Sequence, residues 1–135
     1  MTDLVRDAMV RDPRTLEADA TAQEAGEALA RPEVRAVLVC DGGRLVGVIT
    51  RKTLVREVVA AGRDPRETRL AEIAEEPLFT LDAGLPIEEA FRTMEERDLE
   101  RVPVTEDGRL VGVLSRSALQ RRLAEDDVTE QVEAP

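Results

Sequence analysis

The octapeptide RLVGVITR at residues 44–51 decides the fold of this chain, because it returns almost unchanged as RLVGVLSR at residues 109–116. Each copy follows a turn sequence of acidic residues and glycine, DGG at 41–43 and EDG at 106–108. A run of apolar, mostly β-branched residues after such a turn predicts the second strand of a β-hairpin. The sequence therefore predicts two hairpins, one in each half of the chain.

The duplication extends well beyond the octapeptide. Residues 15–54 align with residues 80–119 without a gap at a separation of 65 residues, and 15 of the 40 aligned positions are identical. A period of this length is too long for a solenoid unit and fits two small domains in tandem. Because half of this chain would form only a marginal core by itself, we expect the two copies to pack against each other.

Helical and strand periodicities predict the same order of elements in both copies, each with a short helical lead-in. The expected elements of the first copy are a lead-in helix at 2–9, an extended segment at 15–16, a helix from 21 that ends at Pro32, strands at 34–40 and 44–49, and a helix at 50–61. Their expected counterparts are a lead-in at 70–74, an extended segment at 80–81, a helix from Pro86, strands at 101–104 and 109–114, and a helix from 115.

These elements predict an α+β fold made of two β-α-β-β-α repeats. We place the first repeat with its lead-in at residues 1–64 and the second repeat at residues 65–124. Residues 125–135 are charged and lack apolar periodicity, so we expect them to form a flexible acidic tail.

The composition describes an acidic globular chain: of its 135 residues 42% are apolar and 36% are charged, with a formal net charge of −10. Because such a protein is repelled by phosphate backbones and anionic lipids, we expect neither nucleic acid nor a membrane as a partner. Only Phe79 and Phe91 are aromatic, too few to stack nucleic-acid bases. The sequence has no apolar run of membrane-spanning length and no signal peptide, which predicts a cytoplasmic protein.

The residue types exclude several kinds of catalysis. The chain contains no histidine and a single cysteine, Cys40, so Cys–His and Ser–His nucleophilic catalysis and the usual zinc sites are excluded, and no disulfide framework is implied. We therefore expect no enzymatic activity and no bound metal. An enzyme that uses a pair of carboxylates stays open as a third hypothesis, although the acidic residues follow no recognisable spacing.

Thr50 and Ser115 each stand where a predicted strand turns into a helix, and cations follow them: Arg51 and Lys52 in the first copy and Arg116 in the second. Cations in the first turn of a helix oppose the helix dipole unless an anion or nearby carboxylates compensate. One interpretation is a phosphate site at which the hydroxyl also donates a hydrogen bond. The other is an N-cap followed by solvated arginines.

The helix expected after Thr50 carries an apolar face that is broader than one small sheet requires. This face is formed by Leu54, Val55, Val58 and Val59. It is either ordinary core or the surface through which two copies of the chain pack. We expect a homodimer.

The pattern resembles the cystathionine-β-synthase (CBS) domain family, and the tandem resembles a CBS pair, or Bateman module. The residues that carry the resemblance are the lead-in at 5–9 with Pro13, the hairpin end GVIT at 47–50, their second-copy counterparts, and VPV at 102–104 before an acidic turn. The resemblance implies two repeats related by pseudo-twofold symmetry, with two clefts between them. It also implies adenine nucleotides or related adenosyl compounds as ligands, and the regulation of an enzyme, channel or transporter.

Carried onto this sequence, the resemblance implies ligand contacts at twelve positions: Thr15, Val37, Thr50, Arg51, Lys52, Thr53, Thr80, Arg101, Val102, Pro103, Ser115 and Arg116. The family usually has an aspartate three residues after the hydroxyl, where it binds the ribose. This chain has Thr53 and Ala118 there. The loss of a charge-assisted hydrogen bond, about 1.5–3 kcal/mol, weakens binding by about tenfold to a hundredfold.

The leading hypothesis is a stand-alone, non-enzymatic regulatory module that senses an adenosyl ligand in the cleft between its repeats. The ligand would be an AMP- or ATP-like nucleotide or S-adenosylmethionine, and the signal would pass to a separate regulated enzyme or transporter. The alternative is a homodimerisation or scaffold module that no longer binds nucleotide, which the residues at 53 and 118 favour.

Overall fold

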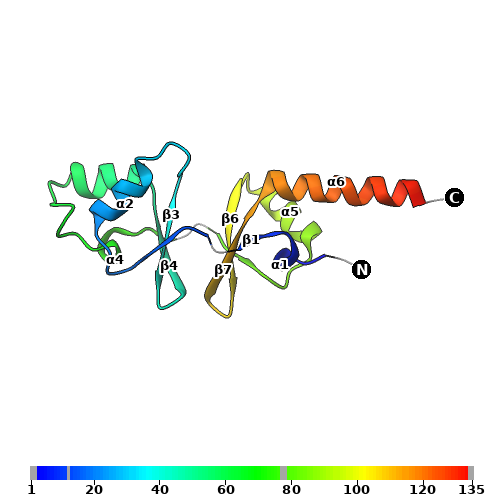
Figure 1. The fold of residues 1–135 in the computed structure, drawn as a ribbon, viewed down its shortest axis with the longest axis horizontal. Helices are drawn as coiled ribbons and strands as arrows, with labels where there is room; N and C mark the ends of the chain where they lie inside the picture. Colours follow the sequence, from blue (N-terminus) through cyan, green and yellow to red (C-terminus); the bar gives the residue numbers. More distant parts are fainter. Residues whose placement is uncertain (1–2, 12, 77–78, 134–135) are drawn as a thin grey trace. The chain divides into compact units, whose positions relative to one another are not determined.

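The computed structural model describes residues 3–11, 13–76 and 79–133. By the contacts between its residues the chain divides into two compact units (Figure 1). The first-repeat unit contains Pro13–Leu78 and Gly108–Leu110, and the second-repeat unit contains Met1–Asp12, Phe79–Asp107 and Val111–Pro135. Each unit has its own sheet strands and helices, so the mixed α+β class predicted for the repeats is confirmed.

The first-repeat unit is built on the β3–β4 hairpin, with α2 and α4 lying on one side of it (Figure 1). β2 pairs with β3 in parallel, and β3 pairs with β4 in antiparallel, with Val37 opposite Ile49. The elements are β2 (Thr15–Glu17), α2 (Ala22–Leu29), β3 (Val37–Asp41), β4 (Arg44–Ile49), α3 (Arg51–Leu54), the π-helix η1 (Val55–Val59) and α4 (Leu70–Ile73).

The second-repeat unit is built in the same way on the β6–β7 hairpin. β5 pairs with β6 in parallel, as β2 does with β3. In addition, β1 pairs with β7 in antiparallel, with Val10 opposite Val113. The elements are α1 (Val5–Ala8), β1 (Val10–Arg11), β5 (Leu81–Asp82), α5 (Ile87–Glu96), β6 (Arg101–Glu106), β7 (Arg109–Ser115) and α6 (Arg116–Glu133).

The two hairpin turns have the backbone that the turn sequences predict. Gly42 and Gly43 both have positive φ, and so do Asp107 and Gly108. Positive φ at both central residues is the requirement of a type I′ turn, whose twist matches that of the flanking strands. Aspartate tolerates this conformation better than most residues, which explains why the second copy needs only one glycine.

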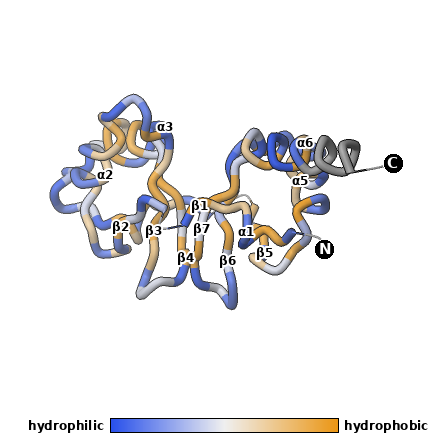
Figure 2. The backbone as a smooth tube through the Cα atoms, turned by 45° about the vertical axis from the view of Figure 1, so that its right-hand side comes forward, coloured by the Kyte–Doolittle hydropathy of each residue, from blue (hydrophilic) through white to orange (hydrophobic). Residues whose placement is uncertain are grey.

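Each unit has its own hydrophobic core, and the two cores are built from matching positions. Figure 2 shows hydrophobic residues gathered along the strands and helices of each unit, with hydrophilic outer turns. Nearly every buried residue of one core has its counterpart 65 positions away in the other core or packed against it. The pairs include Ala25 and Ala90, Leu29 and Met94, Val37 and Val102, Val39 and Val104, Ile49 and Leu114, and Leu70 and Val5.

The last of these pairs shows that the lead-ins are exchanged. Leu70 begins the second sequence repeat but lies fully buried in the core of the first-repeat unit, and Val5 lies fully buried in the core of the second-repeat unit. The Leu70 N–H donates to the Ala20 carbonyl (2.9 Å), and the Val5 N–H donates to the Leu85 carbonyl (2.8 Å). The compact units therefore do not follow the expected division at residues 64/65, because burial joins each lead-in to the other repeat.

The octapeptides contain glycine because the extended segment after each lead-in helix passes too close to the strand for a side chain to fit there. The backbones of Val48 and Glu75 exchange two hydrogen bonds (2.7 and 3.0 Å) beside Gly47. A Cβ on Gly47 would lie 2.6 Å from the Ala74 Cβ, and one on Gly112 would lie 2.8 Å from the Val10 carbonyl oxygen. Neither glycine has a positive φ, so close approach of the backbone explains both.

Four details of the expected elements differ. The strand expected from residue 34 begins at Val37. The short strand β1 was not predicted, since two residues carry no periodicity. The helix after Thr50 continues past α3 as a π-helix. The helix α6 extends through Glu133 and so includes most of the residues expected to form a flexible acidic tail. The expected helix start at Thr2 and the tail end at 134–135 lie outside the described residues.

Candidate ligand site

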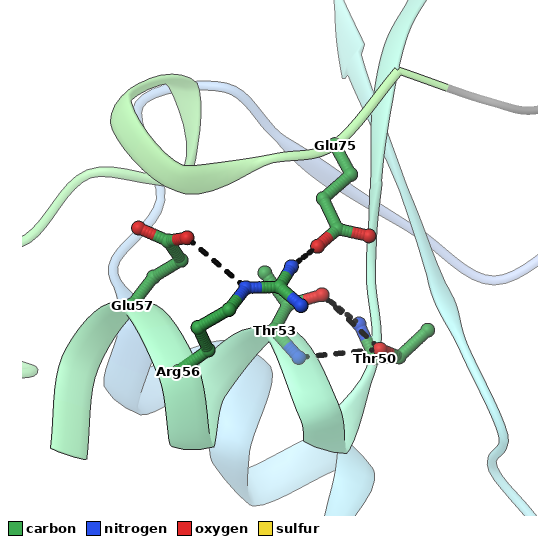
Figure 3. A network of polar contacts seen from close by, with 5 residues as sticks. All are labelled: Thr50, Thr53, Arg56, Glu57 and Glu75. Atoms are coloured by element: carbon green, nitrogen blue, oxygen red, sulfur yellow. Dashed lines mark hydrogen bonds and ion pairs between the residues drawn. The ribbon is translucent and has the colours of Figure 1, made fainter. Parts of the chain in front are cut away.

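Thr50 caps the helix at the end of β4, as predicted, through a reciprocal pair of hydrogen bonds with Thr53 (Figure 3). The Thr53 N–H donates to the Thr50 Oγ1 (3.3 Å), and the Thr50 N–H donates to the Thr53 Oγ1 (3.1 Å). The two hydroxyl oxygens are also 3.1 Å apart, within hydrogen-bonding distance. The first turn of this helix therefore satisfies two of its backbone donors internally.

The capping arrangement decides what Thr53 can do. Its side chain is fully buried, and its hydroxyl is directed at Thr50. A hydroxyl has one donor and two acceptor sites, and these contacts use most of them. Thr53, which stands where the family has a ribose-binding aspartate, can meet a ligand only if the capping pair opens.

The two cations after Thr50 differ in their surroundings. The Arg51 guanidinium donates to the Arg31 carbonyl oxygen (2.8 Å), where it satisfies an acceptor just after the end of α2. Lys52 is exposed, and among the described residues no ion pair or side-chain hydrogen bond engages it. The first repeat thus presents an exposed ammonium group, that of Lys52, two residues after the capping Thr50.

A third cation, Arg56, lies near the capping pair and was missed by the sequence analysis. Its guanidinium forms ion pairs with Glu57 (3.2 Å) and with Glu75, which comes from the segment after α4. Figure 3 shows the guanidinium between the two carboxylates, on the side of the helix that carries Thr53. No local pattern indicated this network, because Arg56 and Glu75 are joined only when the lead-in folds back onto β4.

Each repeat has a corner at which a strand turns into a helix, at Thr50 in the first repeat and at Ser115 in the second. The charge of the cation at the second corner is already neutralised. The Ser115 Oγ accepts a hydrogen bond from the Ala118 N–H (3.1 Å) and caps α6 as predicted. The Arg116 guanidinium forms ion pairs with Asp98 (3.4 Å) and Glu100 (3.2 Å), and its side chain is 26% exposed. Nearby carboxylates therefore compensate this cation, so an anion is not required to explain it.

The remaining predicted site residues are divided between core and surface. Val37, the first residue of β3, and Val102, the second residue of β6, are buried in the two cores, so their side chains are not available to a ligand as the units stand. Pro103 is half-buried. The exposed members are Thr15 at the start of β2, Thr80 just before β5, and Arg101 at the start of β6.

The model of the CBS domain family matches this chain twice, at residues 5–60 and 70–125. The chain belongs to the CBS domain family. The resemblance stated from the sequence is thereby confirmed, and the two matched segments make the chain a CBS pair. Each matched segment begins with the lead-in that precedes its repeat in the sequence. In the compact units, by contrast, each lead-in belongs to the unit of the other repeat.

Relatives of this CBS pair include hypoxic response protein 1 of Mycobacterium tuberculosis, 32% identical over 115 residues that cover 84% of this chain and 80% of that protein. The crystal structure of hypoxic response protein I with two coordinated zinc ions has a TM-score of 0.74 at 29% identity, covering 89% of this chain and 98% of that one. The CBS domain pair of protein MJ0100, solved with 5′-methylthioadenosine and S-adenosylmethionine, has a TM-score of 0.66 at 23% identity, covering 93% and 99%. At that identity the last match shows a shared fold.

The residue types that most often bind zinc are scarce in this CBS pair. The chain has no histidine, and its one cysteine, Cys40, is buried. Burial, and then the nearby Glu17 carboxylate, raise the pKa of the Cys40 thiol above its ordinary value, which disfavours the thiolate that binds zinc. Within the described ranges no three histidine, cysteine or carboxylate side chains gather to hold a metal ion.

An open hollow of ≈ 640 Å³ lies elsewhere in the first-repeat unit, at the carboxyl ends of the parallel strands β2 and β3. It is lined by Glu17, Ala18, Asp19, Asp41, Gly42, Arg69 and Ala71, none of which was predicted as a site residue. At the counterpart of Ala71, 65 positions earlier, Arg6 forms an ion pair with Glu106 (3.6 Å). The first-repeat unit thus has Ala71 at this hollow, where the second-repeat unit has Arg6 at the matching position. None of the helices that the structure describes is long and apolar enough to cross a membrane.

Proposed function

We propose that this CBS pair is a non-enzymatic regulatory module that binds an adenosyl ligand through its first repeat and signals to a separate partner. The observation that carries the proposal is the difference between the two capped corners. Thr50 has the exposed Lys52 beside it, whereas Arg116 beside Ser115 is held by two carboxylates. The adenosyl compounds bound by the fold neighbour described above make this ligand class the first to test.

The chemistry of the first-repeat corner suits a ligand that carries phosphate. An exposed lysine in the first turn of a helix and a hydroxyl at its N-cap provide positive potential and hydrogen-bond donors at the start of the same helix. Thr53 does not replace the ribose-binding aspartate, since its hydroxyl is engaged by Thr50. We therefore expect the phosphate end to supply more of the affinity than the ribose.

The test is calorimetric titration of the intact chain with AMP, ATP, S-adenosylmethionine and NAD. Lys52→Ala should weaken the binding of the phosphate-bearing ligand by about tenfold to a hundredfold, the effect of losing one charge-assisted contact. Arg14→Ala is the matched control, because it removes the same charge from another exposed position of the same unit. Equal weakening in both variants would mean that net charge alone drives binding, and the proposal would fail.

The second candidate is a homodimerisation module without a nucleotide ligand. The burial of Thr53 and the apolar side chain of Ala118 favour it, because neither of these two side chains offers a free acceptor to ribose hydroxyls. If none of the four compounds produces heat with the wild-type chain, this candidate replaces the regulatory one.

Both candidates include a homodimer, and the helix after Thr50 is the surface we propose for it. Val55 and Val59 are 59% and 73% exposed, one helical turn apart on η1, whereas Val58 is buried in the core. We expect light scattering to give about twice the chain mass of 14.9 kDa. Val59→Glu should shift that mass toward one chain, and Arg35→Glu, at an exposed site off this helix, should not. A monomeric wild type would rule the dimer out.

A further inference from the structure

The first-repeat corner already contains a carboxylate of its own, that of Glu75. The backbone of this residue is held against β4 by the two hydrogen bonds it exchanges with Val48, two residues before Thr50. Its side chain reaches the guanidinium of Arg56. Glu75 thus lies beside the point where β4 turns into α3 (Figure 3).

Arg56 is placed to serve this corner. It follows Thr53 by three residues on one continuous helix, so the two side chains share a face. Side chains of helical residues lean toward the helix N-terminus, which directs the guanidinium back toward the capping pair. About half of the Arg56 side chain is exposed, so a solute can reach it.

We propose that Glu75 is an internal gate on the anion corner of the first repeat: its carboxylate holds Arg56, and an anionic group of the ligand must take Glu75's place on that guanidinium. This inference rests on the proposed function and adds Arg56 as an anion-binding residue and Glu75 as its competitor. The guanidinium can bind a phosphate in the same two-pronged way in which it binds a carboxylate.

The gate connects the ligand to the path of the chain between the units. Glu75 stands at the end of the segment that leaves the first-repeat unit, and the chain from Phe79 belongs to the second-repeat unit. When the anion displaces the Glu75 side chain, Glu75 loses its ion pair with Arg56 and keeps its backbone pairing with Val48 of β4. Ligand binding would then weaken the attachment of Glu75 to β4 and the helix that follows it.

The second-repeat unit has no such carboxylate at the matching position. The counterpart of Glu75, 65 positions earlier, is Val10, which has the same antiparallel relation to Val113 that Glu75 has to Val48. Val10 carries no charge and is 66% exposed. The carboxylate is therefore not needed for the strand pairing itself, which both repeats make.

The experiment compares wild type, Glu75→Gln, Glu76→Gln and the double variant Arg56→Gln/Glu75→Gln by calorimetry with inorganic pyrophosphate and with ATP at fixed ionic strength. Glu75→Gln should bind both probes about threefold to fivefold more tightly, since it removes one exposed ion pair that competes with the ligand. Glu76→Gln removes the same charge from the adjacent exposed residue and should stay within about twofold of wild type. The double variant should lose the gain, because the receiving guanidinium is absent.

The outcomes separate the gate from the proposed function. ATP binding that is equal in wild type and Glu75→Gln overturns the gate and leaves the function intact. If Glu75→Gln binds pyrophosphate more tightly than wild type does, but binds ATP no more tightly than pyrophosphate, the gate is supported. The same result would show that the adenosyl part of ATP is not recognised. If Glu76→Gln equals Glu75→Gln, general charge explains the gain and the gate falls. If no variant produces binding heat with either pyrophosphate or ATP, both the gate and the proposed function are overturned.

Amide hydrogen exchange gives a second readout that does not depend on the size of the affinity change. Saturating wild type with ATP should speed the exchange of the Val48 and Glu75 amides, whose mutual hydrogen bonds tie the segment to β4. Unchanged or slower exchange at both amides under saturation contradicts the gate.

Discussion

Leu70→Ala is expected to destabilise the first-repeat unit by about 3 kcal/mol, although Leu70 belongs to the second sequence repeat. The side chain is fully buried among the core residues of the first-repeat unit, so its truncation removes buried surface and leaves a cavity there. Hydrogen exchange read by residue should show faster exchange of the amides of β3 and β4, while those of β6 and β7 keep their protection.

Val5→Ala is the reciprocal control, because Val5 occupies the matching position in the core of the second-repeat unit. Its effect should appear at β6 and β7 and should be smaller, since fewer methyl groups are lost. If Leu70→Ala instead exposes β6 and β7, the lead-ins are not exchanged and each repeat folds with its own.

Gly112→Ala is expected to destabilise the second-repeat unit by about 2–3 kcal/mol, which is typical of overpacking a closely packed site. The new Cβ would lie 2.6 Å from the Met9 Sδ and 2.8 Å from the Val10 carbonyl oxygen. The sulfur can move, but the carbonyl belongs to the strand that pairs with β7, so the backbone must shift. Urea denaturation monitored by circular dichroism measures the loss.

Gly26→Ala is the matched control for the substitution itself. Gly26 lies within α2, where a Cβ would be 3.8 Å from the Leu54 Cδ1, an ordinary contact. Alanine should raise the free energy of unfolding by about 0.5–1 kcal/mol, because it favours the helix more than glycine does. Equal destabilisation by both changes would show that the close approach at Gly112 is not its cause.

Much of the fold could be predicted because its signals are local. The hairpin turns, the caps at Thr50 and Ser115 and the strand at 44–49 depend on residues within a few positions of one another, and all are present. The duplication added information that no single segment contains, because the same order of helices and strands could be predicted independently from each copy. The short β1 has too few residues to show any period, and the helix at 125–133 has no apolar stripe to predict it.

The candidate site could be predicted only in part. The capped corners and their adjacent cations were found from residue types at a strand-to-helix junction. The partners of those cations were not, because Arg116 meets Asp98 and Glu100, and Arg56 meets Glu75, across loops that bring distant residues together. Whether a cation is free or paired depends on those partners, and this is what distinguishes the first repeat from the second.

By itself the sequence determined the CBS pair: two repeats, their elements and the residues that start each helix, since these follow from periodicity and from self-comparison. Only the tertiary structure decided which lead-in completes which core and why Gly47 and Gly112 lack a side chain. It alone also showed that the Glu75 carboxylate forms an ion pair with the Arg56 guanidinium. The physical reason is that burial and ion pairing depend on which residues meet in space, and the sequence around each of these residues carries no local trace of its partner.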